Sequence, residues 1–211
     1  MVQVEGLLDP PNASLVRSSI RDANERDSTM VVLQIDSGGA VDVDVAELVR
    51  VVRESEVPIV AWVGPSGSDV KGATALLVEA AHVASVSSGS GIGPVAPLRL
   101  DDPGHPTSAQ VADDLAALAA ANGRRPDGAR QLANDRLSGD DAQQVGAVNT
   151  VEPTLGELIV SLDGRVVSTP PPVRGCCAPP PWWARGSTAA VNRIKTSAST
   201  GCHSTRRCCT R

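Results

Sequence analysis

The sequence predicts one α/β domain, with a mostly parallel sheet flanked by helices, followed by a tail without regular structure. Strand-like and helix-like segments alternate along the first 151 residues, which implies right-handed βαβ units. The strand-like runs are β-branched and apolar throughout, as in strands buried on both faces. Hydrophobic residues make up 41% of the 211 residues, enough to form a core.

The first half of the domain contains four expected strands and three expected helices. The strands are expected at 1–6, 31–35, 58–63 and 83–86, and the helices at about 13–24, 45–54 and 72–81. Asn12 or Ser14 can cap the first helix. In the second helix, apolar residues at 45, 48, 49 and 52 have the spacing of one buried face. The sequence Asp36-Ser37-Gly38-Gly39 is expected to end the second strand.

The second half is predicted to be mainly helical. A glycine-rich loop at 87–94 and a loop at 101–108 precede an alanine-rich helix at 109–121, which Asn122-Gly123 can end. The remaining elements are expected at 125–137 (helix), 138–141 (start of a short helix), 146–151 (strand) and 155–162 (amphipathic segment).

Charge divides the chain after Arg165. Residues 1–165 hold all 24 acidic residues and 12 basic ones, a net charge of −12, whereas 166–211 hold seven basic residues and no acidic one. An acidic domain argues against nucleic-acid binding. The tail is rich in proline and has no periodicity, which predicts disorder. The boundary is therefore expected at 1–165 and 166–211.

All five cysteines lie in the tail, so the domain itself has no thiolate metal site or disulfide. Cys202, His203, Cys208 and Cys209 suggest a zinc site, but their spacing fits no established finger, and adjacent cysteines rarely serve one site. No metal or other cofactor is expected. The chain also lacks a signal peptide and an apolar run of membrane-spanning length, which predicts a soluble protein.

Six segments, in order, carry a resemblance to a known family. They are EGLLDPPNASLV, VVLQIDSGGAVD, ESEVPIVAWVGPSG, ALLVEAAHVASVSSGSGIGPVAPL, NGRRPDGARQL and LSGDDAQQVGAVNTV. Together they cover most of residues 4–152 and resemble the protease domain of the NfeD family, the partners of stomatins. The resemblance implies a Clp-protease/crotonase-like fold, serine endopeptidase ancestry, membrane association, a stomatin-like partner and a homo-oligomer.

The resemblance also locates two catalytic positions, and neither holds a catalytic residue. Active members use a serine at the start of the helix after the GPSG-like turn, and this position falls on Gly72. Their general base is a lysine seven residues before a Gly-Arg pair, here Gly123-Arg124, and this position falls on Ala116. A Ser/Lys dyad needs a hydroxyl beside an amine whose pKa is lowered. We therefore expect a degenerate, non-catalytic domain that binds a partner.

Other residues were weighed as substitutes for this dyad. Ser66, Ser68 and Lys71 lie next to Gly72, but Lys71 and Gly72 do not share a helix face. A residual serine peptidase using these residues is the first alternative. A crotonase-like acyl-CoA-binding enzyme, with Glu79 or Glu54 as its acid, is the second.

The Gly38-Gly39 pair resembles the glycines that donate backbone N–H groups to an oxyanion in this superfold. The motif is one residue shorter than the family's, so the register lies between 38/39 and 39/40. The alternative is a simple turn.

The remaining polar candidates favour structural or solvated roles. His82, at a helix-to-strand junction, is interpreted as a structural histidine, and His105 lies in a loop without a visible partner. Asp36, Asp42 and Asp44 could suggest a cation site, although capping or solvation is the more ordinary role.

The ends of the chain lead to one further hypothesis. NfeD proteins carry a signal sequence before this domain and membrane helices after it. An out-of-frame tail after about residue 165 and a late start codon would account for both differences. A genuine basic tail whose Trp182-Trp183 pair contacts a membrane surface is the alternative.

Overall fold

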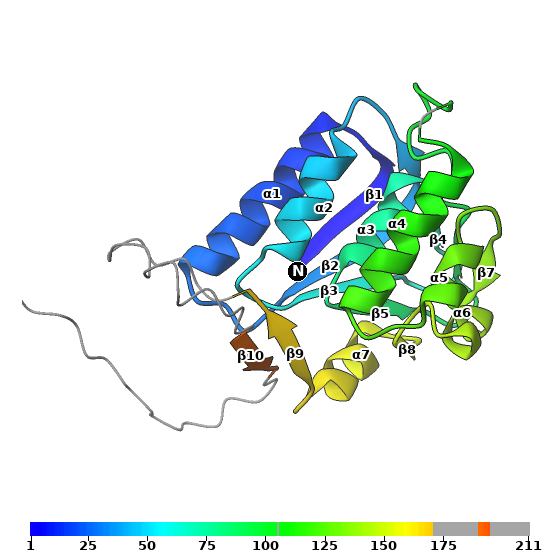
Figure 1. Ribbon diagram of the computed structural model, residues 1–211. Helices are drawn as coiled ribbons and strands as arrows, with labels where there is room; N and C mark the ends of the chain where they lie inside the picture. Colours follow the sequence, from blue (N-terminus) through cyan, green and yellow to red (C-terminus); the bar gives the residue numbers. More distant parts are fainter. Residues whose placement is uncertain (105, 171–189, 195–211) are drawn as a thin grey trace, which may run out of the picture.

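The β-branched runs of the sequence form the centre of a curled, mostly parallel sheet in the computed structural model, which describes residues 1–104, 106–170 and 190–194 (Figure 1). Its strands are β1 (Val2–Leu8), β2 (Val31–Ala40), β3 (Ile59–Val63), β4 (Asp69–Val70), β5 (Val83–Val86), β6 (Gly91–Ile92), β7 (Leu137–Ser138) and β8 (Thr150–Val151). The α/β class is confirmed.

Seven helices are present in the described part of the chain. They are α1 (Pro10–Glu25), α2 (Val45–Arg53), α3 (Ala73–Ala80), α4 (Ser108–Ala121), α5 (Pro126–Gln131), α6 (Gly139–Val145) and α7 (Leu155–Leu162). None of these helices is long and apolar enough to cross a membrane.

The sheet divides at the carboxyl end of β2. One edge of β2 pairs with β1, while the other pairs first with β3 and then, at Ser37, with Val70 of β4. From β3 the sheet continues to β5 and β8, and from β4 to β6 and the antiparallel β7. Because α3 begins three residues after β4, the start of this helix lies at the fork.

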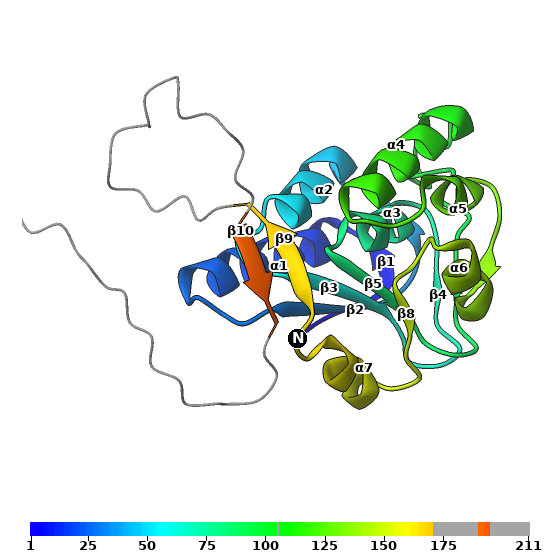
Figure 2. The ribbon, with the colours of Figure 1, turned by 60° about the horizontal axis from the view of Figure 1, so that its bottom comes forward.

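Two separate apolar cores cover the two faces of the sheet. The larger joins the sheet to α1, α2, α3 and α4, and includes the fully buried Leu33, Leu48 and Leu115. The smaller joins Val60 and Trp62 of β3 to α7. Figure 2 shows α7 on the opposite side of the sheet from α2, α3 and α4.

Several element boundaries differ from those expected. Strand β2 continues through Gly38 and Gly39 to Ala40, because β1 pairs with it from Leu33 to Ser37 and again, after a shift in register, at Ala40. Helix α1 begins at Pro10, and its cap is Asp9, which accepts the N–H of Asn12 at 2.9 Å, rather than Asn12 or Ser14.

The expected helix at 125–137 ends at Gln131. The carbonyl oxygens of Leu132 and Ala133 accept the N–H groups of Val95 and Ala96, at 2.8 and 3.0 Å, instead of continuing the helix. The strands β4, β6 and β7, of two residues each, were not expected, and the strand expected at 146–151 is limited to Thr150–Val151.

Two short segments beyond the expected boundary at Arg165 also have regular structure. Strand β9 (Val166–Thr169) pairs antiparallel with β10 (Ala190–Arg193). Val167 of β9 and Ile194, the residue after β10, are buried in the smaller core. The prediction of a tail without regular structure therefore does not hold for these two segments, and the rest of the tail lies outside the described residues.

Candidate functional site

Gly72, the expected nucleophile position, lies at the fork of the sheet as the N-terminal cap of α3. Its φ of 59° and ψ of −139° belong to a region that glycine tolerates and other residues rarely adopt. Sharp strand-to-helix turns of this kind present the nucleophile in other hydrolase folds. The position thus has the backbone geometry of a nucleophile site and no side chain.

The surroundings of Gly72 also leave little room for a side chain. A Cβ atom built on this residue would lie 3.0 Å from the carbonyl oxygen of Pro97 and 3.1 Å from that of Leu98. It would also lie 3.5 Å from the Cα of Gly39. All three neighbours are backbone atoms, so a serine here would require the chain to move.

The chain segment 94–100, called here the closing segment, covers the start of α3. Gly72 donates its N–H to the carbonyl of Pro94, and Ala73 donates its N–H to that of Leu98, both at 3.0 Å. Leu100 donates its N–H to the carbonyl of Ala40 at 2.8 Å, and Ala40 forms a parallel bridge with Arg99. The N-terminal amides of a helix usually bind an anionic or carbonyl oxygen, and here Ala73 binds one from the chain itself.

The predicted oxyanion pair, Gly38-Gly39, and the predicted base position, Ala116, lie at different places around Gly72. Gly39 approaches Gly72 closely, whereas an added Cβ on Gly38 would meet nothing within 4 Å. Ala116 is 5% exposed on α4, which packs against α3. The oxyanion role of the glycine pair stays a prediction.

The structure does not bring the candidate substitutes together as a dyad. Ser66 donates its hydroxyl to the carbonyl of Ser88, and Ser68 is buried. The Lys71 ammonium faces the carboxylate of Asp69, with 3.8 Å between Nζ and Oδ2. No hydrogen bond joins Lys71 to either serine among the described residues.

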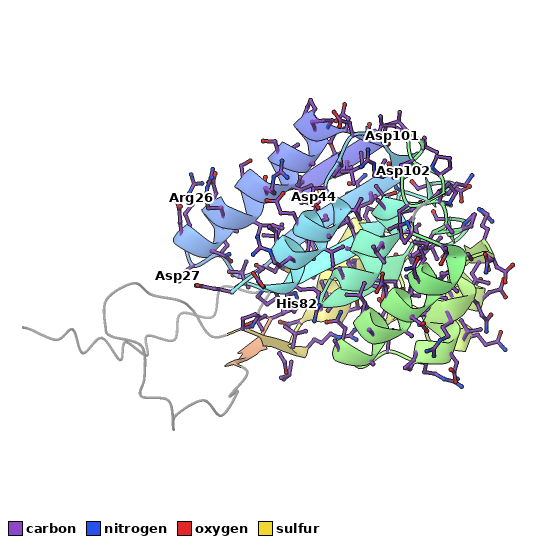
Figure 3. All side chains as sticks on the ribbon, turned by 45° about the horizontal axis from the view of Figure 1, so that its top comes forward. Arg26, Asp27, Asp44, His82, Asp101 and Asp102 are labelled. Atoms are coloured by element: carbon purple, nitrogen blue, oxygen red, sulfur yellow. The ribbon has the colours of Figure 1, made fainter. Side chains whose placement is uncertain are left out.

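An open pocket of about 730 Å³ adjoins the closing segment. It lies between α2, the loop before α4, and α4 itself. Apolar side chains of α2, α3, α4 and the neighbouring segments line it, together with charged residues. The lining residues are Val43, Val45, Ala46, Val49, Leu76, Leu98, Pro106, Ala117, Leu118, Asp42, Asp44, Asp102, Asp114, Arg53 and Arg99. Four carboxylates against two guanidinium groups make this lining acidic. Figure 3 labels two of these residues, Asp44 at the start of α2 and Asp102 in the loop before α4.

A buried polar cluster occupies the other end of α3. The Arg124 guanidinium contacts the Glu79 carboxylate, with 3.1 Å between Nε and Oε2, and both side chains are at most 1% exposed. Burial raises the pKa of Glu79 to about 7, while Arg124 acts in the opposite direction. The second oxygen of Glu79 has no partner among the described residues. Glu79 is therefore enclosed in the core and cannot contact a ligand bound beside the start of α3.

His82 belongs to the same cluster. Its Nδ1 accepts the N–H of Ile59 at 3.1 Å, which supports the structural role expected of it. Burial and the nearby Arg124 charge lower its pKa to about 4. Glu54, the other expected acid, forms an exposed ion pair with Arg50 at 2.7 Å.

The three candidate aspartates have local structural contacts. Asp44 caps α2 by accepting the N–H of Glu47 at 2.9 Å, and Asp36 accepts the N–H of Asp69 at 3.1 Å. Asp42 donates its N–H to the carboxylate of Asp101. No three potential metal-binding side chains gather in the part of the chain that the structure describes. His105 and the tail cysteines lie outside it.

Two features of the site were not anticipated from the sequence. The closing segment is apolar apart from Arg99, and its contacts with α3 are made by backbone groups, which leave no side-chain signature. The Glu79–Arg124 pair joins residues 45 positions apart. Two adjacent arginines, Arg124 and Arg125, follow the helix-ending Asn122-Gly123, and nothing in the sequence indicates which of them is buried.

Three solved structures share the fold. A lysine-to-alanine mutant of the 1510-N membrane-bound stomatin-specific protease, in complex with a substrate peptide, matches at a TM-score of 0.75 and 16% identity, over 92% of this chain and 86% of that one. The 1510-N protease specific for a stomatin homologue from Pyrococcus horikoshii matches at 0.67 and 18%, over 82% of each chain. The ClpP catalytic domain from Plasmodium falciparum matches at 0.55 and 10%, over 72% of this chain and 84% of that one.

No protein-family model and no curated protein matches the sequence. The structural matches establish that this chain has the fold of the Clp-type proteases, as the resemblance to the NfeD family implied.

Proposed function

We infer that this chain is a non-catalytic domain of the NfeD type, which binds a peptide segment of a partner protein. The observation that carries the inference is the start of α3, where position 72 has no side chain and the Ala73 amide already holds the Leu98 carbonyl. A hydrolase needs a nucleophile and a free donor for the developing oxyanion at this place. Here the nucleophile position has no side chain, the Ala73 amide is occupied, and the base position is Ala116.

The open pocket beside the closing segment offers a binding surface. Its apolar residues can receive an aliphatic side chain, and its surplus of carboxylates favours a basic residue next to that side chain. The structural relatives include proteases specific for a stomatin homologue, which supports a segment of a stomatin-like protein as the partner. Membrane association through that partner and homo-oligomerisation belong to the same proposal.

The loss of catalysis is tested with an activity-based probe. A fluorophosphonate should not label the chain, and fluorescent peptide substrates should not be cleaved. The double variant Gly72→Ser with Ala116→Lys should also stay inactive, because its serine Cβ meets two backbone carbonyls. Labelling that disappears on replacement of Ser66 or Ser68 would instead support a residual peptidase.

Binding is tested with peptides that tile a stomatin-like protein of the source organism. Val49 of α2 lines the pocket, whereas Val160 of α7 is 75% exposed on the opposite side of the sheet. Val49→Glu should weaken binding of the best peptide at least tenfold, because it adds a charge to the pocket, and Val160→Glu should leave binding unchanged. Equal effects of the two substitutions, or no binding peptide, would contradict the proposal.

A further inference from the structure

A second pocket, at the opposite end of α3 from Gly72, is lined by hydrogen-bond donors. It measures about 380 Å³ and is called here the donor pocket. Its lining residues come from the α3–β5 junction, the end of α4, the residue before β8, and β9 with the residue before it: His82, Ala120, Ala121, Asn122, Gly123, Asn149, Arg165, Val166, Val167 and Ser168. It shares no lining residue with the pocket beside the closing segment.

Hydrogen bonds to the core fix the orientation of the His82 and Asn149 side chains, and each of them keeps an N–H donor without a partner among the described residues. His82 accepts the Ile59 N–H through Nδ1, so the neutral ring carries its proton on Nε2. Asn149 uses its Oδ1 to accept the Ala84 N–H at 2.9 Å and Arg124 Nη1 at 3.2 Å. The Nε2 of His82 and the amide nitrogen of Asn149 have no acceptor among the described residues.

Arg165 supplies a cation to the same pocket. Its guanidinium forms no ion pair among the described residues, and partial burial lowers its pKa. No acidic residue lines the pocket, although residues 1–165 carry a net charge of −12. Because no lining carboxylate balances this half-buried arginine, a negatively charged ligand would meet a cation without a competing partner.

The end of α4 forms one wall of the donor pocket, and its carbonyl groups repel a negatively charged ligand only weakly. The last carbonyls of a helix normally carry partial negative charge. Here the carbonyls of Leu118, Ala119 and Ala120 accept the N–H groups of the three residues that follow the helix, Asn122 to Arg124. The buried Arg124 guanidinium donates to Asn149 Oδ1, but the Glu79 carboxylate balances its charge, so Arg165 is the cation that an anion in this pocket would meet.

We propose that the donor pocket binds a compact oxyanion, a phosphate or a carboxylate group, through Arg165, His82 Nε2 and the Asn149 amide. A guanidinium fork and two neutral N–H donors form the set that proteins use for such groups. The Ser168 hydroxyl, on the rim, can add a fourth donor. Figure 3 labels His82 at this end of the molecule.

The proposal is tested by NMR of the ¹⁵N-labelled full chain. The His82 imidazole resonances, assigned with a His82→Asn variant, are followed during titration with sodium phosphate and with sodium acetate, against sodium chloride at equal ionic strength. We expect a saturable shift of the Nε2–H resonance with phosphate, acetate or both, and none with chloride. The more effective anion identifies the natural group as phosphate-like or carboxylate-like.

Two variants and a control show whether the pocket is responsible. Arg165→Gln removes the cation, and Asn149→Asp keeps the acceptor for Ala84 and Arg124 while removing the amide donor. Each should weaken the anion at least tenfold. Arg21→Gln, at a side chain that is 69% exposed on α1, should have no effect. Non-saturable shifts, shifts equal to those with chloride, or unchanged affinity in a folded variant would overturn the proposal.

Discussion

The two ends of α3 are built from different kinds of atoms. At its N-terminal end, Gly72 and Ala73 are surrounded by the backbone of Gly39 and of the closing segment. At its C-terminal end, the contacts are made by charged and polar side chains, with Glu79 and Arg124 at the centre. The first end has no titratable side chain at Gly72 or Ala73, while the second has groups with displaced pKa values, of which Glu79 is enclosed in the core and His82 lines the donor pocket.

This difference shows that a displaced pKa and a functional position need not coincide. Perturbed carboxylates are often guides to active sites, but burial in a structural ion pair perturbs them as well. Glu79 belongs to the second kind because it is fully enclosed. The fold has a positive-φ turn at Gly72, and the contacts around this turn are made by backbone groups, which do not titrate.

The largest expected effect comes from breaking the buried ion pair. Arg124→Met leaves Glu79 buried without its partner and should lower the free energy of unfolding by about 3–5 kcal/mol. Arg125→Met, at the exposed neighbouring residue, should cost less than about 1 kcal/mol. Urea denaturation measures both. A similar cost for the two variants would show that the buried pair is not a main determinant of stability.

An intermediate effect is expected at the N-terminal end of α3, where backbone atoms surround Gly72. Gly72→Ala combines a positive φ with close carbonyl contacts and should lower the free energy of unfolding by about 2–3 kcal/mol. Gly164→Ala is the matched control, because its φ is +75° and an added Cβ meets nothing within 4 Å. It should cost about 1 kcal/mol. If thermal or urea unfolding gives equal losses, the closing segment does not constrain position 72.

The smallest effect concerns pH. As pH falls from 6.5 towards 4, the unfolded chain protonates its histidine while folded His82 stays neutral, so this residue lowers stability on acidification. Glu79 acts in the opposite sense, because folded Glu79 takes up its proton near pH 7 and the unfolded chain does so near 4.5. The two contributions oppose each other.

His82→Asn should therefore make the chain gain stability relative to the parent as pH falls, by at most about 1.4 kcal/mol per pH unit. Urea unfolding at pH 7, 5.5 and 4.5 measures the difference. Parallel pH profiles of the variant and the parent would contradict the lowered pKa assigned to His82.

The sequence predicted the strands and helices that bury apolar periodic faces, and it located Gly72 on the turn before α3. Such features depend on local pattern. It did not predict the closing segment, because the partners of Leu98 are backbone groups about 25 residues away. The pairing of β9 with β10 joins two segments that are separated by the proline-rich sequence 170–189, and no alternating pattern in the sequence predicts either strand.

Amide hydrogen exchange at Ala73 tests the closed site most directly. First-turn amides of a helix normally lack a partner and exchange quickly, as expected for the half-buried Ser108 at the start of α4. Because Ala73 donates to the Leu98 carbonyl, we predict that its amide exchanges at least a hundredfold more slowly than that of Ser108. Equally fast exchange at both residues would mean that the closing segment does not cover the start of α3 and would contradict the account.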